Sequence, residues 1–362
     1  MDLTKIVITG GPCAGKSTAL SRIQEEFTKL GYTVLFVSET ATELINGGVA
    51  PWTCKTSDDF QKFLIKLQIE KERIFELSAS SMATEKVLIV CDRGMLDNKA
   101  YMTQQAFENT LSEFNLNEVE IRDNYDAVFH LVTAADGAMD FYTTENNTAR
   151  TETPAQAIEL DKKLLSAWTG HPHLRVIDNS TTFENKIKKL IAEISSFLGE
   201  PEPLEIERKF LIEYPDIDWL ENSPNCQKIE IIQTYLKSEL NEEIRVRQRG
   251  MNGNYIYFKT IKRKISDLKR IEIEKRLSKD EYLALLMEAD TEKRQIRKNR
   301  YCLMFENQYF EIDIYPFWSD KAILEIELSD ENAGIVFPEE IKIIKEVTDD
   351  DNYKNASLAK FK

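Results

Sequence analysis

A glycine-rich segment near the start of the chain has residue types and spacing that suit phosphate binding. The segment 10–17 reads Gly-Gly-Pro-Cys-Ala-Gly-Lys-Ser and fits the pattern GxxxxGK[ST] in full. Glycines let backbone N–H groups converge on phosphate oxygens, Lys16 can reach the terminal phosphates, and the Ser17 hydroxyl can ligate Mg²⁺. We therefore expect a nucleoside triphosphate with Mg²⁺, or Mn²⁺, to be held by Gly10, Gly11, Pro12, Cys13, Ala14, Gly15, Lys16, Ser17 and Thr18.

Charged residues follow two further apolar runs. Asp92 ends the run 87–92 and is followed by Arg93, which we expect to contact the nucleotide, and Glu39 follows the run 33–38. In a parallel sheet these strand ends lie at the edge where ligands bind. Asp92 would hold magnesium-bound water or orient a phosphate acceptor, and Glu39 would bind an acceptor or act as a general base. Capping for Asp92 and a surface position for Glu39 are the alternatives.

Two polar positions later in the first half are also candidates. The polar segment 143–153 precedes a helical pattern and is long enough to close over a nucleotide, which would make Arg150 the neutraliser of charge during phosphoryl transfer. An ordinary solvated loop is the alternative. Asn179 follows the fifth apolar run, where we expect contact with the base, although a turn-forming asparagine explains it equally well.

The second half of the chain carries ionisable residues at every second position of its strand-like runs. Glu-x-Glu and Arg-x-Arg rows on one sheet face repel themselves, unless a polyanion neutralises the basic rows and divalent cations neutralise the acidic ones. Between Arg245 and Arg300 there are 17 basic and 8 acidic residues, so positive charge is concentrated there. We predict an interior that holds a triphosphate, with a solvated sheet face as the alternative. The runs are 205–210, 244–249, 255–259, 271–274, 310–314 and 324–328.

The elements that must position these residues fall into two groups. Residues 1–198 alternate short apolar runs with helical stretches, which predicts an α/β domain with a doubly wound parallel sheet. Gly199-Glu-Pro-Glu-Pro203 breaks both patterns. We predict a P-loop domain over 1–199 and an antiparallel β-barrel α+β domain over 204–362. Expected strands in the first domain are 5–9, 33–38, 87–92, 127–132 and 174–178, and expected helices are 17–30, 57–83, 154–168 and 183–198, with Ser57 and Thr153 as N-caps.

Composition narrows the class of protein. The 362 residues suit about two domains, and a formal charge of −15 argues against undirected attraction to nucleic acid or to anionic membrane. There is no apolar run of ~18 residues, and the N-terminus enters a strand pattern at once, so we expect neither a membrane span nor a secretory signal. The five cysteines show no CxxC spacing, which favours unpaired thiols in a cytoplasmic protein.

The first 198 residues resemble a known P-loop family. The loop 10–17, Asp92-Arg93-Gly94, Arg150-Thr-Glu-Thr-Pro154 and Ala167-Trp-Thr-Gly-His-Pro-His173 are similar to the NadR-like, AAA-type P-loop domain shared by ribosylnicotinamide kinases and the TRPL translocation defect family. The stretch 168–173 and the presence of a following domain fit the second group better. The resemblance implies binding of a nucleoside triphosphate, GTP for the translocation defect family and ATP for the kinases.

The second half resembles the CYTH, or triphosphate tunnel metalloenzyme, superfamily. Glu205-Ile-Glu207-Arg-Lys209 is the ExExK signature of that superfamily, and the other charged rows follow in the expected order. Spacing alone leaves open which of Arg294, Arg297 and Arg300 points inward. The resemblance implies metal ligation by Glu205, Glu207, Glu325 and Glu327, phosphate contacts from Lys209, Arg245, Arg247, Lys259, Arg294 and Arg300, and assistance to metal or water by Asp313.

Three functions are compatible with these patterns. We favour a metal-dependent triphosphatase or NTPase that binds GTP or ATP in the first domain and binds or hydrolyses a triphosphate in the second. A nucleoside-type small-molecule kinase with a regulatory tunnel domain is the second possibility. The third is a non-catalytic, GTP-gated regulatory or trafficking module that binds acidic phospholipid. Nucleic acid is disfavoured, because no basic stripe is interleaved with aromatic residues.

Overall fold

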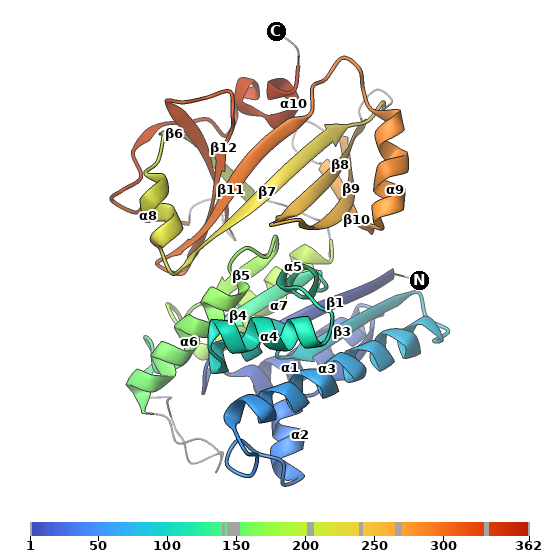
Figure 1. Cartoon of the computed structure of the whole chain (residues 1–362), viewed down its shortest axis with the longest axis vertical. Helices are drawn as coiled ribbons and strands as arrows, with labels where there is room; N and C mark the ends of the chain where they lie inside the picture. The colour runs from blue at the N-terminus through green and yellow to red at the C-terminus, as the bar shows by residue number, and fades with distance from the viewer. Residues whose placement is uncertain are drawn as a thin grey trace. The chain divides into compact units, whose positions relative to one another are not determined.

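The chain divides into two compact units in a computed structural model (Figure 1). The structure describes residues 2–139, 142, 153–200, 206–238, 242–264, 270–328 and 333–360. The first unit is Met1–Ile194 and the second is Ser195–Lys362. The division falls just ahead of the Gly199–Pro203 segment, where both sequence patterns end.

A five-stranded parallel sheet forms the centre of the first unit, and it confirms the predicted parallel sheet. Its order is β2-β3-β1-β4-β5, and every pair is parallel. β1, β3 and β4 are buried along most of their length, as apolar strands covered on both faces must be. The strands are β1 (Asp2–Thr9), β2 (Thr33–Val37), β3 (Lys86–Asp92), β4 (Ala127–Leu131) and β5 (Leu174–Ile177).

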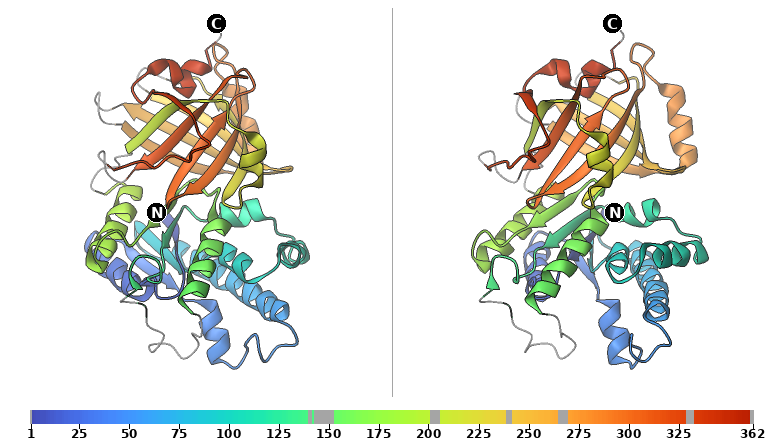
Figure 2. Two further views of the ribbon diagram at one scale, coloured as in Figure 1. Left: turned by 90° about the vertical axis from the view of Figure 1, so that its left-hand side faces the viewer. Right: turned by 60° about the vertical axis from the view of Figure 1, so that its left-hand side comes forward.

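Helices lie on both faces of this sheet (Figure 2). Four of them confirm the predicted long helices to within a few residues, whereas α2, α4, α5 and the 3-10 helix η1 were not predicted because they are short. The helices are α1 (Lys16–Lys29), α2 (Thr40–Asn46), α3 (Ser57–Ser80), η1 (Met95–Tyr101), α4 (Gln104–Glu113), α5 (Glu118–Arg122), α6 (Pro154–Trp168) and α7 (Phe183–Phe197).

Side-chain caps explain where two of these helices begin. Thr153 caps α6 as predicted, in a reciprocal capping box with Gln156. The predicted cap of α3 was wrong by one residue. Thr56 has the extended backbone of an N-cap and its hydroxyl accepts a hydrogen bond from the Asp59 amide at 3.0 Å, which places Ser57 inside the helix.

The second unit is built on a nine-stranded antiparallel sheet. Its order is β10-β9-β8-β7-β11-β12-β13-β6-β14. Within the described residues β10 and β14 are the two edges and do not pair, so the predicted closed barrel is not shown. The strands are β6 (Ile206–Glu213), β7 (Cys226–Tyr235), β8 (Glu242–Met251), β9 (Asn254–Lys264), β10 (Arg270–Leu277), β11 (Ile296–Phe305), β12 (Gln308–Ile314), β13 (Lys321–Leu328) and β14 (Ile343–Glu346).

Short helices complete this unit, and the sheet has two chemically different faces. The helices are α8 (Ile217–Asn222), α9 (Lys279–Leu285), η3 (Leu286–Glu288), η4 (Asp351–Tyr353) and α10 (Asn355–Leu358). On one face, alternate residues of β6, β12 and β13 form an apolar core that includes Phe210, Ile312 and Leu324. The intervening positions carry the charged rows, as the period-2 pattern predicted.

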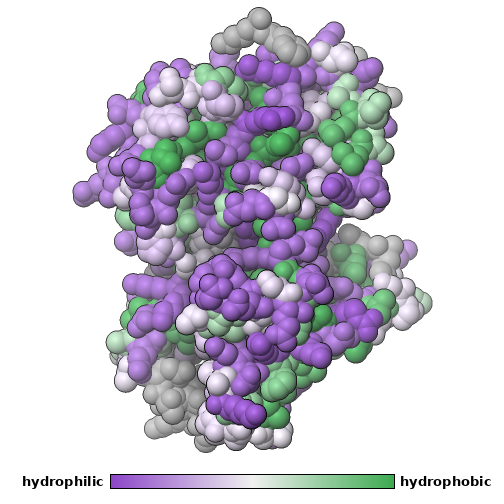
Figure 3. All heavy atoms as spheres, viewed as in Figure 1, coloured by the Kyte–Doolittle hydropathy of each residue, from purple (hydrophilic) through white to green (hydrophobic). Residues whose placement is uncertain are grey.

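The surface fits the charged composition. On the side shown in Figure 3, hydrophilic residues prevail and apolar residues form small separate groups. Across the described parts of the chain, no helix has the length and apolar character needed to cross a membrane. Cys54, Cys91, Cys226 and Cys302 are free thiols.

Candidate functional site

The first unit contains a cavity of about 1300 Å³ at the carboxyl ends of its strands. The phosphate-loop residues 12–18 form one wall, and the segments after β2, β3 and β5 form others. Glu39, Asp92, Arg93 and Asn179 all line this cavity. The structure therefore brings together the loop and the strand-end residues that the sequence singled out.

The phosphate loop has a backbone that glycine makes possible. Gly10 has a φ of +139°, and a Cβ atom there would lie 2.0 Å from the carbonyl oxygen of Leu131. Gly15 has a φ of +93° and directly precedes α1, so the loop leads into a helix N-terminus. Lys16 Nζ donates to the carbonyl oxygen of Gly10 at 3.2 Å, so the lysine curls back along the loop. This backbone suits an anion.

Glu39 forms an ion pair with Arg93. Arg93 Nε donates to Glu39 Oε1 at 2.7 Å, and Thr42 donates to the other carboxylate oxygen at 2.6 Å. Burial would raise the pKa of Glu39, but the charges of Arg93 and Lys16 outweigh it and hold that pKa at about 2. Such a carboxylate is a weak base near neutral pH, which favours positioning of Arg93 over general-base catalysis.

Asp92 offers an unsatisfied oxygen to the cavity. Its Oδ1 is buried and has no hydrogen-bond partner among the described residues. Burial raises the pKa of Asp92, although Lys16 opposes this effect. A buried carboxylate oxygen without a partner fits a cation or a cation-bound water, and Ser17 lines the same cavity. Ser17 and Asp92 therefore fit the predicted magnesium site.

The amide of Asn179 is used by the protein itself. It donates to the carbonyl oxygens of Thr133 and Asp136, at 2.7 and 2.6 Å, and accepts from Lys186 Nζ at 2.8 Å. Asn179 therefore shapes the cavity wall. Lys186 also lines the cavity, donates to the Val132 carbonyl at 2.6 Å, and has its pKa lowered to about 8 by burial. Lys186 was not predicted, because only its place on the buried side of an amphipathic helix marks it.

The stretch 168–173 packs in the core of the first unit. Trp168 is fully buried, and its Nε1 donates to Asp97 Oδ1 at 3.1 Å. The same oxygen accepts from the hydroxyl of Thr9 at 2.5 Å, and Thr9 is the residue directly before the phosphate loop. Through Asp97, Trp168 of the predicted motif therefore supports the strand end that leads into the loop. Arg150 lies outside the described residues.

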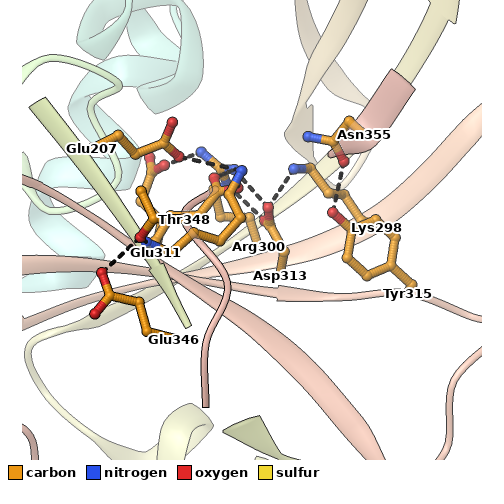
Figure 4. A network of polar contacts seen from close by, with 11 residues as sticks. Glu207, Lys298, Arg300, Glu311, Asp313, Tyr315, Glu346, Thr348 and Asn355 are labelled. Carbon is orange, nitrogen blue, oxygen red and sulfur yellow. Dashed lines mark hydrogen bonds and ion pairs between the residues drawn. The ribbon is translucent and has the colours of Figure 1, made fainter. Parts of the chain in front are cut away.

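A network of ion pairs crosses the sheet of the second unit (Figure 4). Arg300 donates to both oxygens of Asp313 at 2.7 Å and to Glu325 at 2.8 Å. Arg300 also pairs with Glu311, Lys298 pairs with Asp313, and Lys209 Nζ lies 2.7 Å from Glu325. The expectation that each row needs an external counter-charge was wrong at these positions, because acidic and basic rows face one another.

The strand register shows on which face of the sheet each charged residue lies, because residues directly opposite one another on neighbouring strands point to the same face. Arg247 lies opposite Phe258, Thr260 lies opposite Glu274, and both Arg247 and Thr260 donate to Glu274, at 2.9 and 2.8 Å. We call the face with these residues the charged face. Its charged residues include Glu207, Lys209, Glu243, Arg245, Arg247, Arg249, Lys262, Glu274, Arg276, Lys298, Arg300, Glu311, Asp313, Glu325 and Glu327.

Lys259 was assigned wrongly to the phosphate-binding set. It lies opposite Val246 and Lys275, on the other face of the sheet from Arg245 and Arg247. Successive strand residues point to opposite faces, so a shift of a few positions along the run decides which lysine points inward. Lys262, opposite Glu243 and Glu272, is a lysine of β9 on the charged face, and it was not predicted.

Arg294 was also assigned wrongly. It precedes β11, and its guanidinium donates to the carbonyl oxygen of Leu358 at 3.0 and 2.8 Å while lying over the Phe317 ring. Arg294 therefore holds the segment near α10. Arg297 is exposed, and Lys298 and Arg300 are buried, so the strand alternation settles which basic residues of this segment point inward.

The predicted metal ligands differ in how the protein uses them. Burial would raise the pKa of Glu325, but the charges of Lys209 and Arg300 outweigh it and lower that pKa. The Glu207 side chain is 45% exposed, and its Oε1 lies 3.6 Å from Lys209 Nζ. Glu327 lies opposite Glu207 in the register. Glu205 lies outside the described residues. Within the described residues, no cluster of three metal-ligating side chains is found. Opposed carboxylates such as Glu207 and Glu327 fit a divalent cation.

Fold and sites together define a chain with a P-loop nucleotide-binding unit and a second unit that has a charged sheet face. Residues 5–186 match the family model described as "AAA domain". An inorganic triphosphatase of Nitrosomonas europaea (strain ATCC 19718 / CIP 103999 / KCTC 2705 / NBRC 14298) is 33% identical to this chain over 159 residues, which are 43% of this chain and 96% of the relative. The chain belongs to the AAA domain family through residues 5–186, and to the family of that triphosphatase through the 159 residues.

Solved structures are also similar to this chain. The crystal structure of the inorganic triphosphatase NE1496 is 30% identical, covers 43% of this chain and 94% of its own, and has a TM-score of 0.31. The PH1819 protein from Pyrococcus horikoshii OT3 is 22% identical, covers 35% of this chain and 80% of its own, and has a TM-score of 0.27. These scores are too low to establish a shared fold by themselves. None of these matches bears on the TRPL translocation defect family, so that resemblance stays a prediction.

Proposed function

We propose that this protein binds a magnesium–nucleoside triphosphate in its first unit and binds and hydrolyses a triphosphate on the charged face of its second unit. The observation that carries the proposal is that each unit has its own group of phosphate-complementary residues. The AAA match occupies the first unit, so we assign the similarity to inorganic triphosphatase to the second.

In the first unit, the proposed ligand lies along the loop 10–17. Its phosphate oxygens accept hydrogen bonds from the loop amides and from Lys16, which exchanges its contact with the Gly10 carbonyl for the ligand. Ser17 and Asp92 would hold Mg²⁺, which offsets the negative charge of the phosphates when bound. Arg93, oriented by Glu39, adds a second cation to the same wall. Either ATP or GTP suits this account, because the described wall residues do not select a base.

In the second unit, the triphosphate exchanges partners with an existing network. Its oxygens accept from Lys209, Arg245, Arg247, Lys262 and Arg300, and the carboxylates released by that exchange become available to cations. Glu207 and Glu327 would hold Mg²⁺ or Mn²⁺, together with Glu205 and Glu325. When bound, such an ion polarises phosphate oxygens and activates water. Asp313 keeps Arg300 and Lys298 aligned.

Measuring phosphate release from inorganic triphosphate, ATP and GTP tests whether the first unit binds a nucleotide and the second unit hydrolyses a triphosphate. The variant Glu207→Gln/Glu327→Gln is expected to lose most triphosphate hydrolysis, and EDTA is expected to abolish it in the wild type. Lys16→Ala is expected to leave triphosphate hydrolysis unchanged and to weaken nucleotide binding roughly 10- to 100-fold, the range for a lost charge-assisted contact. Unaltered hydrolysis in the glutamate variant would show that the charged face is not the active site.

A kinase function for the first unit is a second candidate, favoured by one observation. Gln61 Oε1, Asp92 Oδ1 and Arg93 Nη1 are buried without partners among the described residues, and all three residues line the same cavity. These atoms would suit a hydroxyl-bearing acceptor beside the terminal phosphate. Transfer of labelled γ-phosphate to a nucleoside, and not to water, would support this candidate. Label found only in inorganic phosphate would exclude it. The phospholipid-binding alternative stays a prediction.

A further inference from the structure

Asp161, a residue of α6, makes a direct contact with the phosphate loop. The backbone amide of Gly11 donates to Asp161 Oδ1 at 2.5 Å, and the two residues are 150 positions apart in the chain. Asp161 is only 5% exposed and is not among the residues that line the cavity. It therefore touches the loop from behind and does not face the proposed ligand.

Thr133, which follows β4, holds the neighbouring peptide of the loop. Its hydroxyl donates to the carbonyl oxygen of Pro12 at 2.5 Å, and its own backbone amide donates to Asp161. The Asp161 side chain thus holds the N–H group of Gly11, and the Thr133 side chain holds the C=O group of Pro12. The two residues are also joined, because the Thr133 backbone amide donates to Asp161. We call Asp161 and Thr133 the loop brace.

The loop brace explains a glycine that the phosphate-binding pattern does not require. Gly11 occupies one of the four variable positions of GxxxxGK[ST]. A Cβ atom at Gly11 would lie 2.7 Å from Asp161 Oδ1, 2.9 Å from Asp161 Cβ and 3.1 Å from Thr133 Cβ. Only glycine lets both brace residues approach the loop this closely.

Asp161 has two polar neighbours besides the loop. His130 Nε2 lies 3.2 Å from Asp161 Oδ1, and Lys186 adds a favourable charge interaction. Burial would raise the pKa of Asp161, but His130 and the amides of Gly11 and Thr133 outweigh it and lower that pKa. An ionised acceptor makes a stronger hydrogen bond to an amide than a neutral one does. The local charges therefore favour a firm hold on Gly11.

We propose that Asp161 is a positioning residue that fixes the phosphate loop in its ligand-binding shape, acting through the Gly11 amide. This inference rests on the proposed binding of a nucleoside triphosphate in the first unit. Without Asp161, the Gly11 amide is buried and unpaired, so the loop must shift or admit water before it can bind phosphate. Preorganisation of the loop would then be lost, and nucleotide affinity with it.

The test compares Asp161→Ala, Asp161→Asn and the matched control Glu159→Ala in the full chain. Glu159 lies on the same helix, but its side chain is exposed and pairs with Lys163 at the surface. Affinity for Mg²⁺ complexes of non-hydrolysable ATP and GTP analogues is measured by calorimetry. We expect Asp161→Ala to bind roughly 10- to 100-fold more weakly, Asp161→Asn to recover part of the loss through its carbonyl oxygen, and Glu159→Ala to match the wild type.

Two outcomes would overturn the inference, and they can be told apart. If the wild type binds and a folded Asp161→Ala variant binds within threefold of it, Asp161 does not position the loop. If the wild type binds neither analogue, the proposed function of the first unit fails and the inference fails with it. Should Asp161→Ala unfold, Thr133→Val removes the other half of the brace with little change of volume. Weaker binding by folded Thr133→Val would support the brace, and unchanged binding would refute it.

Discussion

The two units present phosphate-complementary groups in different ways. In the first unit the phosphate-binding groups belong mainly to the backbone of the loop 10–17, whose shape depends on Gly10 and Gly15. Asp92 Oδ1 faces the cavity and has no partner among the described residues. In the second unit the groups are side chains, and Arg300 already pairs with three carboxylates. A ligand can enter the first site without breaking salt bridges, whereas at the second it must replace them. The first site is thus preorganised for an anion, whereas the second site binds an anion by replacing ion pairs that already exist within the protein.

This difference has an energetic consequence for folding. Ion pairs that are fully buried add little net stability, but the loss of one partner leaves an uncompensated charge in a poorly solvated place. The charged face should therefore be more sensitive to single neutral substitutions than the phosphate loop is.

The largest effect is expected from Arg300→Met. This change leaves Asp313, Glu311 and Glu325 without their shared guanidinium, so we expect the free energy of unfolding to fall by about 3–5 kcal/mol. Denaturant titration of the full chain measures the change. Arg297→Met is the matched control on the same strand, because Arg297 is exposed, and it should change stability little. Equal losses in both variants would mean that the ion-pair network is not what stabilises β11.

The next effect separates two lysines of β9. Lys262→Ala should weaken triphosphate binding roughly 10- to 100-fold, because it removes a charge-assisted contact from the charged face. Lys259→Ala should leave affinity unchanged, because Lys259 shares the opposite face with Val246. Calorimetric titration with inorganic triphosphate distinguishes them. The reverse ranking would show that the register, and with it our assignment of the faces, is wrong.

The smallest effect concerns the pH dependence of stability near the phosphate loop. The pKa of Lys186 is about 8 in the folded chain against an ordinary value of 10.5, so the unfolded chain binds more protons between these values and stability rises with pH there. From pH 7.5 to 9.5 the wild type should gain about 1–2 kcal/mol relative to Lys186→Met. Parallel denaturant curves at the two pH values give this difference. A difference that stays constant with pH would mean that Lys186 titrates normally.

Local sequence patterns predicted much of the first unit. The pattern at 10–17 specifies both a backbone shape and a chemical role. Short apolar runs rich in β-branched residues, such as 87–92, favour buried strands. The contact of Asp161 with Gly11 could not be predicted, because no local pattern links residues 150 positions apart. The short helices between β3 and β4 were missed for a similar reason, since tertiary packing more than periodicity stabilises them.

In the second unit the alternation predicted that one face is charged but not every residue that belongs to it. β7 and β11 lie at the centre of the sheet, yet their mixed sequences were not recognised as strands. Lys298 was therefore overlooked and Arg294 was placed in the wrong set. Lys259 was misassigned because side chains alternate between faces, and only pairing with β8 and β10 fixes which lysine faces inward.

The central claim is that the chain has two separate triphosphate sites, one built from a backbone loop and one from paired side chains. Crystals soaked with a nucleoside triphosphate analogue, inorganic triphosphate and Mn²⁺ test it most directly, because anomalous scattering locates the cations. We predict the nucleotide on the loop 10–17 with Mn²⁺ near Ser17 and Asp92, and the inorganic triphosphate beside Lys209, Arg247 and Lys262. Both anions in one site, or triphosphate away from the charged face, would contradict the claim.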